Sequence, residues 1–261
     1  MSERVLQAEG ITKSFGAQRV LDKVGIEVGK AEIVGLLGPN GSGKSTLLNV
    51  LSGFYPADAG RILLSGEDLT QDSMFRRARK GLVRTFQLPS MPARLTAWEV
   101  LLAGCVEFTG AASALWRGAA QRRAAQAARE NAEQLLREFH LESVRDQPAS
   151  TLSGGQKKLL SMATVLISRP RLLCLDEPTA GVHPNLRKEM VAMLRRSRAQ
   201  GTAILVIEHD MGFVGELCDR CVVLDRGEVI ADCPPGALSQ NARVVSAYLG
   251  QPGSDVPEPV S

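Results

Sequence analysis

Three apolar runs in the chain have the length and composition of buried β-strands. They cover residues 31–37, 172–175 and 202–207, and glycine, carboxylate or histidine residues follow them. Segments with helical periodicity lie between these runs, so the pattern predicts an α/β fold. Ligands of open α/β sheets bind beyond the carboxyl ends of the strands, and the polar residues after the three runs are therefore candidates for a site.

Alternating and short apolar patterns predict further strands in the remaining sequence. These strands cover residues 4–15, 19–28, 61–64, 81–86, 221–225 and 228–232. The last two form a hairpin around Arg226 and Gly227, and residues 244–249 are expected to form a final helix. The basic residues 76–80 are interpreted as the solvated face of a helix.

Residues 88–150 differ from the rest because they are rich in alanine and arginine and carry no strand pattern. Apolar side chains recur there at helical spacing, at Ala125, Ala128, Ala132, Leu135, Leu136 and Phe139. We therefore expect an inserted helical subdomain at about residues 88–156, in a core formed by about 1–87 and 157–250. Residues 251–261 contain three prolines and are expected to be a disordered tail.

The segment after the first apolar run reads GPNGSGKST and has the pattern of a phosphate-binding P-loop. Its residues are Gly38, Pro39, Asn40, Gly41, Ser42, Gly43, Lys44, Ser45 and Thr46. Glycines let backbone N–H groups point inward, and the helix that follows turns its positive end toward the same place. Lys44 would reach the β- and γ-phosphates of a nucleotide, and the Ser45 hydroxyl would ligate Mg²⁺. A plain strand-to-helix turn is the alternative, but both flanks also fit a P-loop.

A second helix start occurs at LSGGQ, residues 152–156. Ser153 is a favourable N-cap residue, and Gly154 and Gly155 would expose backbone N–H groups ahead of Gln156. Such a segment can be a capped helix and nothing more, or a helix N-terminus that holds a phosphate. The P-loop upstream favours the second interpretation.

Acidic and histidine residues follow the other two apolar runs. Asp176 and Glu177 end the second run, and His209 follows the third. Asp176 would hold Mg²⁺ directly or through water, and Glu177 could accept a proton from the water that attacks the γ-phosphate. An isolated His209 would be taken as a structural histidine, but its place beside the two acids favours a γ-phosphate contact.

Two further candidates depend on how the chain folds. Phe15 could stack on an adenine face, or it could be an edge-strand aromatic packed on a neighbour, and spacing does not decide between these. Gln87 takes part only if the fold brings it near the nucleotide.

The composition is that of an ordinary soluble protein of 261 residues, with a net charge of +3. Lysine and arginine are scattered and do not form a stripe, so we expect no nucleic-acid partner. No run of eighteen apolar residues occurs, and the first ten residues lack the apolar core of a signal peptide. We therefore expect the chain to stay in the cytosol, with any membrane association being peripheral.

The five cysteines are odd in number and dispersed, which fits a reducing compartment. Cys218 and Cys221 form a CxxC pair, but the sequence offers no second pair and no nearby histidine to complete a zinc site. We interpret them as buried thiols at a helix-to-strand junction.

The P-loop, Gln87, LSGGQ, LLCLDE and His209 occur in the order found in ATP-binding cassette (ABC) ATPases, which the chain resembles over nearly all of residues 4–250. LSGGQ is the signature that separates this family from kinases, GTPases and helicases with P-loops. The resemblance implies a P-loop NTPase core with antiparallel N-terminal strands, an inserted helical subdomain, and the cofactors ATP and Mg²⁺.

The resemblance also implies a role for each candidate residue. Phe15 would stack on adenine, and Gln87 would touch Mg²⁺ and sense a membrane partner. Asp176 would be a metal ligand, Glu177 the catalytic base and His209 the γ-phosphate switch. Lys44, Ser45 and Thr46 would contact the phosphates and Mg²⁺, while Ser153, Gly154 and Gly155 would cap the ATP bound to the other protomer of a head-to-tail dimer.

One position departs from the family pattern. Many ABC ATPases carry an aspartate where this chain has His183, and that aspartate helps to couple the two sites. Coupling through this loop is therefore in doubt, although the branch with AGLNP-like loops also lacks the acid.

A finer resemblance rests on GLVRTFQ, EPTAGVHP, VIEHDM and SAYLG. These segments look like the ATPase of branched-chain or other hydrophobic amino-acid uptake systems. Urea and amide importers share them, and the lipopolysaccharide-export ATPase does so partly. The implied partners are transmembrane permease subunits, a second ATPase subunit that is this chain or a sister, and indirectly a periplasmic binding protein. The implied location is the cytoplasmic face of the inner membrane.

Two other functions are disfavoured by the sequence. A translation or DNA-repair ATPase of the same family would usually show two cassettes or a long coiled coil, and this chain has one P-loop and a short, alanine-rich insertion. A small-molecule kinase would need an acceptor site and has no use for LSGGQ.

Overall fold

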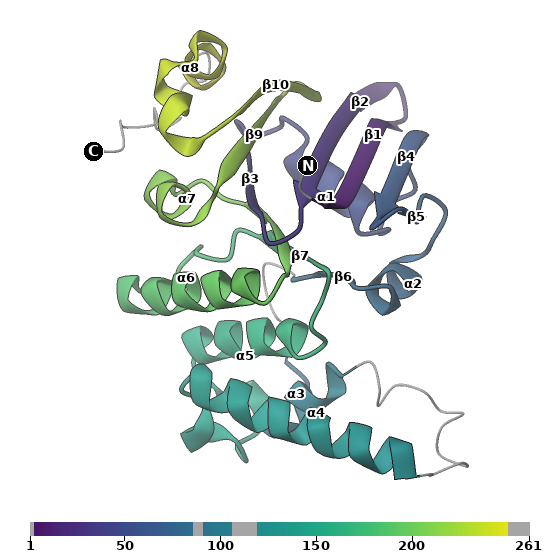
Figure 1. The fold of residues 1–261 in the computed structure, drawn as a ribbon. Helices are drawn as coiled ribbons and strands as arrows, with labels where there is room; N and C mark the ends of the chain where they lie inside the picture. Colours follow the sequence, from purple (N-terminus) through teal and green to yellow (C-terminus); the bar gives the residue numbers. More distant parts are fainter. Residues whose placement is uncertain (1–2, 86–90, 106–118, 250–261) are drawn as a thin grey trace. The chain divides into compact units, whose positions relative to one another are not determined.

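The computed structural model describes residues 3–85, 91–105 and 119–249, which form two compact units (Figure 1). The first, here the core unit, takes its described residues from 1–84, 171–180 and 194–261. The second, here the helical unit, takes them from 85–170 and 181–193. The helical unit begins close to the expected residue 88 but extends beyond residue 156, because the helix after LSGGQ packs with its other helices.

A six-stranded sheet organises the core unit in the order β10-β9-β3-β8-β7-β6. Its strands are β3 (Ile33–Leu37), β6 (Leu82–Arg84), β7 (Leu172–Asp176), β8 (Ala203–Ile207), β9 (Arg220–Asp225) and β10 (Glu228–Cys233). All neighbours pair in parallel except β9 and β10, which form the predicted hairpin. Asp176 is paired with Ile207, so the residues after β7 and β8 emerge together at one edge of the sheet.

A second sheet is antiparallel, with the order β2-β1-β4-β5. Its strands are β1 (Arg4–Phe15), β2 (Gln18–Gly29), β4 (Ala59–Leu64) and β5 (Glu67–Asp68). Alternating apolar side chains on β1 and β2 face inward, as their sequence pattern predicts.

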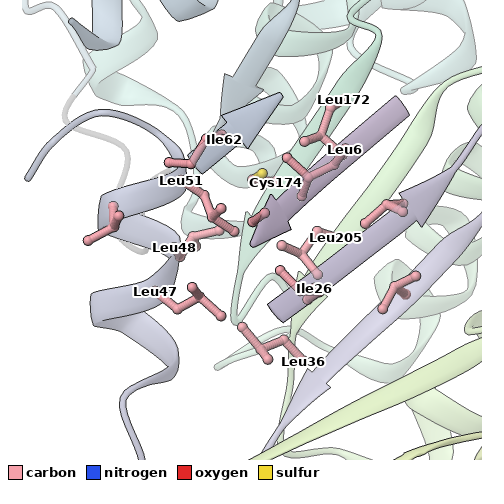
Figure 2. Close-up of a cluster of buried hydrophobic side chains, with 14 of the residues drawn as sticks. Leu6, Ile26, Leu36, Leu47, Leu48, Leu51, Ile62, Leu172, Cys174 and Leu205 are labelled. Atoms are coloured by element: carbon pink, nitrogen blue, oxygen red, sulfur yellow. The ribbon is translucent and has the colours of Figure 1, made fainter. Parts of the chain in front are cut away.

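Helix α1 (Lys44–Leu51) joins these two sheets through one apolar cluster. Figure 2 shows Leu47, Leu48 and Leu51 of α1 pointing toward Leu6 and other side chains of the strands. The three leucines of α1 are fully buried. Because α1 begins directly at the glycine-rich segment, this packing fixes where that segment stands against the sheet.

Three more helices lie in the core unit, α2 (Met74–Arg79), α7 (Met211–Leu217) and α8 (Ala242–Leu249), together with a 3-10 turn at Pro235–Gln240. Helix α6 (Pro184–Ala199) starts in the helical unit and ends in the core unit. Cys218 and Cys221 are buried where α7 leads into β9, as predicted.

The expectation of a solvated basic face on α2 was wrong for Arg77, which is 1% exposed. Its guanidinium donates to the carbonyls of Val50 and Leu51 at the end of α1. It also donates to the carbonyls of Thr70 and Asp72. Arg77 thus satisfies carbonyl groups at a helix C-terminus, a role that helical periodicity around residue 77 does not reveal.

We expect Arg77→Met to lower the free energy of unfolding by about 3 kcal/mol, because buried carbonyl groups lose charged hydrogen-bond donors. Chemical denaturation of the two proteins measures this difference. Arg76→Met is the matched control, because Arg76 is exposed on the same helix and should cost no more than about 0.5 kcal/mol. Equal stabilities of the two variants would contradict the capping role.

The helical unit contains α3 (Ala97–Ala103), α4 (Ala119–Glu138) and α5 (Gly154–Leu166), with 3-10 turns at Glu142–Val144 and Ala149–Thr151. The predicted apolar stripe of α4 and the turn after it is buried at Ala128, Ala132, Leu135, Leu136 and Phe139. A side chain at Gly104 would lie 2.3 Å from the carbonyl of Thr164, so glycine is needed where α3 meets α5. Within the described residues, none of the helices is long and apolar enough to cross a membrane.

Candidate functional site

The segment between β3 and α1 adopts a conformation that depends on glycine. Gly38 has φ 144°, and a Cβ there would lie 2.0 Å from the carbonyl oxygen of Leu224. Gly43 is left-handed with φ 105° and caps α1. Both positions exclude other residues, and the backbone between them can therefore turn its N–H groups toward an anion.

Neighbouring elements hold this loop from its other side. The carbonyl of Ser42 accepts a hydrogen bond from Gly227 in the β9–β10 turn, at 3.0 Å. The N–H of Gly38 donates to the phenol oxygen of Tyr248 in α8, also at 3.0 Å. The loop is thus supported by segments that follow it by about two hundred residues in the sequence.

Lys44 is buried at the start of α1, and its ammonium donates to the carbonyls of Gly38 and Pro39 at 2.7 and 2.9 Å. Burial lowers the pKa of Lys44, while the carboxylates of Glu177 and Asp176 oppose that shift. The ammonium has three N–H donors, so a phosphate oxygen would take the third or replace one of these carbonyls.

Asp176 ends β7 with its two carboxylate oxygens in different environments. Oδ2 accepts a hydrogen bond from Arg84 at 3.2 Å. Oδ1 is buried and has no hydrogen-bond partner among the described residues. Burial raises the pKa of Asp176, and the Arg84 guanidinium opposes this. A buried acceptor without a partner is costly, and it suits Mg²⁺ or a water bound to Mg²⁺.

Arg84 belongs to this site but was missed in the sequence. Its guanidinium also donates to Asn49 and Ser52 near the end of α1, so it ties that helix to Asp176. The sequence signal that could have identified Arg84 is its position at the end of a short strand. An arginine buried there needs a carboxylate or carbonyl partner.

Glu177 and His209 meet at the sheet edge. The Glu177 Oε1 and His209 Nε2 atoms are 3.1 Å apart, and an ionised carboxylate requires that this imidazole nitrogen donate. Glu177 has φ 46°, unusual for a residue with a side chain, and its N–H donates to the carbonyl of Ile207. Uncommon backbone of this kind is often found at functional sites.

Glu208 was expected at this sheet edge together with His209, but no role was assigned to it from the sequence. It is 3% exposed, and one carboxylate oxygen accepts hydrogen bonds from both the N–H and the hydroxyl of Thr179. Its other oxygen accepts the N–H of His209 at 3.1 Å. Glu208 therefore links the loop after Glu177 to the segment that carries His209.

The core unit thus gathers Lys44, Asp176, Glu177 and His209, whose charges act on one another. Ser45 and Thr46 follow Lys44 in α1, with Ser45 exposed. Phe15 is 44% exposed and lies edge-on to Tyr55, with ring centroids 5.3 Å apart. Gln87 lies outside the described residues.

The LSGGQ segment lies in the helical unit and starts α5. The Ser153 hydroxyl accepts the N–H of Gln156, and the Gln156 side chain accepts the N–H of Ser153. This reciprocal capping fixes the first turn of α5 and leaves Gly154 exposed. In the same unit, the exposed His183 precedes α6, and its carbonyl accepts the N–H of Arg187.

Comparisons with known proteins find relatives over nearly the full length of the chain. A family profile described as ABC transporter matches residues 21–180. The branched-chain amino acid transport protein BraF of Pseudomonas aeruginosa is 36% identical over 254 residues, covering 96% of this chain and 100% of the relative. The lipopolysaccharide export protein LptB of Escherichia coli is 32% identical, and the match covers 94% of this chain and 97% of the relative.

Solved structures are similar as well. An ABC transporter cassette in its ADP conformation has a TM-score of 0.81 and 33% identity, covering 95% of this chain and 99% of that one. A nucleotide-free cassette has a TM-score of 0.76 and 32% identity, and the match covers 96% of this chain and 97% of that one. The predicted P-loop fold of the ABC type is confirmed. The chain therefore belongs to the ABC transporter family, of which it is an ATP-binding and ATP-hydrolysing member.

Proposed function

We propose that the chain is the ATPase subunit of an ABC importer for branched-chain or other hydrophobic amino acids. The observation that carries the hydrolytic part is the group formed by Lys44, Asp176, Glu177 and His209 at one sheet edge. The relatives named for branched-chain amino acid transport, which match nearly the full length, favour the importer.

In this proposal the loop from Gly38 to Thr46 binds the phosphates of ATP. Mg²⁺, when bound, would neutralise phosphate charge, held by Ser45, Asp176 and, as proposed from the resemblance, Gln87. Glu177 accepts a proton from the attacking water, and His209 donates to the γ-phosphate. The protein thus contributes positioning and charge stabilisation more than covalent chemistry.

We further propose that two cassettes form a head-to-tail dimer around ATP. The capped start of α5 supports this, because its exposed glycine backbone and helix N-terminus suit an anion. Ser153, Gly154, Gly155 and Gln156 would contact the nucleotide that is held by the P-loop of the second protomer. ATP then favours closure and hydrolysis favours opening, a ligand-driven shift between two states.

The partners in this proposal are permease subunits at the cytoplasmic face of the inner membrane. An exposed apolar patch of the core unit, formed by Phe54, Met74 and Phe75, supports a protein partner. The backbone segments that carry these residues are close together, since a Cβ on Gly53 would lie 3.0 Å from the Met74 nitrogen. Apolar side chains gathered in this way often mark interaction sites. A periplasmic binding protein would act indirectly, through the permease.

We expect Phe75→Glu to reduce association with the permease while ATP hydrolysis by the isolated chain is retained, because the change buries a charge in the contact. Co-expression with the permease genes of the same operon and sedimentation of membranes measures the association. Leu249→Glu is the matched control, since Leu249 is 61% and Phe75 62% exposed. Unchanged sedimentation of Phe75→Glu would exclude the patch as the docking surface.

The substrate class is tested by the subunits that copurify with the tagged chain from membranes. Amino-acid permease subunits support the importer. Lipopolysaccharide-export subunits would indicate instead an export ATPase, the alternative suggested by the similarity to LptB. Urea or amide permease subunits would indicate a urea or amide importer. A chain that never sediments with membranes would point to a non-transport ATPase.

A further inference from the structure

Tyr248 connects the last turn of α8 to the first residue of the P-loop. Its phenol oxygen accepts the N–H of Gly38 at 3.0 Å, across 210 positions of sequence. Gly38 is buried, so an acceptor from the protein is needed for this N–H. The nucleotide and Mg²⁺ contacts proposed above use no residue of α8.

Gly38 is held through both of its backbone polar groups. Tyr248 binds its N–H, while its carbonyl accepts the ammonium of Lys44 at 2.7 Å. Gly38 has no Cβ to restrict its backbone, and its φ of 144° is a conformation that other residues rarely adopt. Such a residue keeps one geometry only where its surroundings impose it. Tyr248 supplies one of these restraints by accepting the N–H of Gly38, whereas Lys44 acts on its carbonyl.

We propose that Tyr248 is a positioning residue of the nucleotide site, which holds the start of the P-loop in the geometry that binds phosphates. In this view α8 forms part of the site. The proposal rests on ATP binding by the P-loop. If Lys44 exchanges the carbonyl of Gly38 for a phosphate oxygen, the hydrogen bond that the Gly38 N–H donates to Tyr248 still keeps the beginning of the loop in place.

The contact depends on the hydroxyl and can be removed without removing the packing of the ring. Burial raises the pKa of Tyr248, so the phenol remains neutral at physiological pH. Helix α8 is also anchored through Val244, which is 1% exposed. Tyr248→Phe should therefore keep α8 docked while the N–H of Gly38 loses its acceptor.

We expect Tyr248→Phe to raise the Kd for ATP and for ADP by about 5- to 10-fold, because the phosphate-binding loop loses a fixed end. At saturating ATP, kcat should stay within about twofold of the parent, since Glu177 and His209 are not touched. Equilibrium binding of both nucleotides, steady-state kinetics and thermal unfolding together measure these effects. Leu249→Ala is the control, as an exposed neighbour on α8 that should leave the Kd unchanged.

A structural role alone would give a different result. If Tyr248→Phe lowers the Tm but leaves both Kd values within twofold, Tyr248 only anchors α8 and the proposal is overturned. A fall in kcat with unchanged Kd would overturn it too. Lys44→Ala separates this from a failure of the nucleotide site itself: should Lys44→Ala bind ATP as tightly as the parent, the assignment of the P-loop fails, whatever Tyr248→Phe does.

Discussion

Glu177→Gln should retain ATP binding, trap a closed dimer and lower turnover by roughly 10²- to 10⁴-fold. The amide has nearly the shape of the carboxylate but cannot take a proton from water. ATP would therefore still bring two protomers together, and the step that releases them would be slow. The position suits this role, because the unusual backbone of Glu177 and its contact with His209 hold the carboxylate at the sheet edge.

Turnover is measured by phosphate release, and dimer formation by size-exclusion chromatography with ATP. Glu216→Gln is the control, because Glu216 is an exposed carboxylate on α7, the helix that follows His209 and Asp210. It should hydrolyse ATP like the parent and form no long-lived dimer. Near-normal turnover in Glu177→Gln would exclude Glu177 as the base.

The strands and the core of the site were predictable because their signals are local. The runs that became β3, β7 and β8 are fully buried and apolar, and such runs differ clearly from their flanks. The P-loop and the acids after β7 follow these strands directly. A parallel sheet brings the residues after its strands to one edge, so Glu177 and His209 were expected at the same edge, and the pairing of β7 with β8 brings them into contact.

Arg77, Arg84 and Glu208 were not predictable because their roles depend on distant partners. Arg77 lies in a run of basic residues that matches a solvated helix face, yet its guanidinium reaches carbonyls of α1 some twenty-six residues away. Arg84 contacts Asp176 across ninety-two positions and Glu208 contacts Thr179 across twenty-nine. The partners of such charged side chains are determined by tertiary packing, and the periodicity of the sequence carries no information about it.

The aromatic at Phe15 shows where local spacing leaves two outcomes open. Its ring packs edge-on against Tyr55, as an edge-strand aromatic would, and it is still 44% exposed. Stacking on adenine therefore stays a prediction. The alternating apolar pattern predicts the strand on which Phe15 lies, but not the neighbour that its ring contacts.

A mixture of Ser153→Arg and Lys44→Ala chains should hydrolyse ATP although each parent alone is inactive. In a head-to-tail dimer each site combines the P-loop of one protomer with the LSGGQ segment of the other. The heterodimer then has one site with both defects and one site with neither. Random mixing would give at most about a quarter of normal activity, since half of the dimers are mixed and each keeps one intact site.

The matched control places both substitutions in one chain and mixes it with the unsubstituted chain. Its heterodimer has one defect in each site. If the two elements act across the interface, only the unsubstituted homodimers of this mixture are active, and they give about a quarter of normal activity. If they act within one chain, the first mixture is inactive and the control gives about half of normal activity, because every unsubstituted chain keeps a complete site. Full activity of Ser153→Arg alone would show that the LSGGQ segment is not part of the nucleotide site. The two mixtures differ only in how the substitutions are distributed, and the comparison therefore isolates the geometry from the severity of either defect.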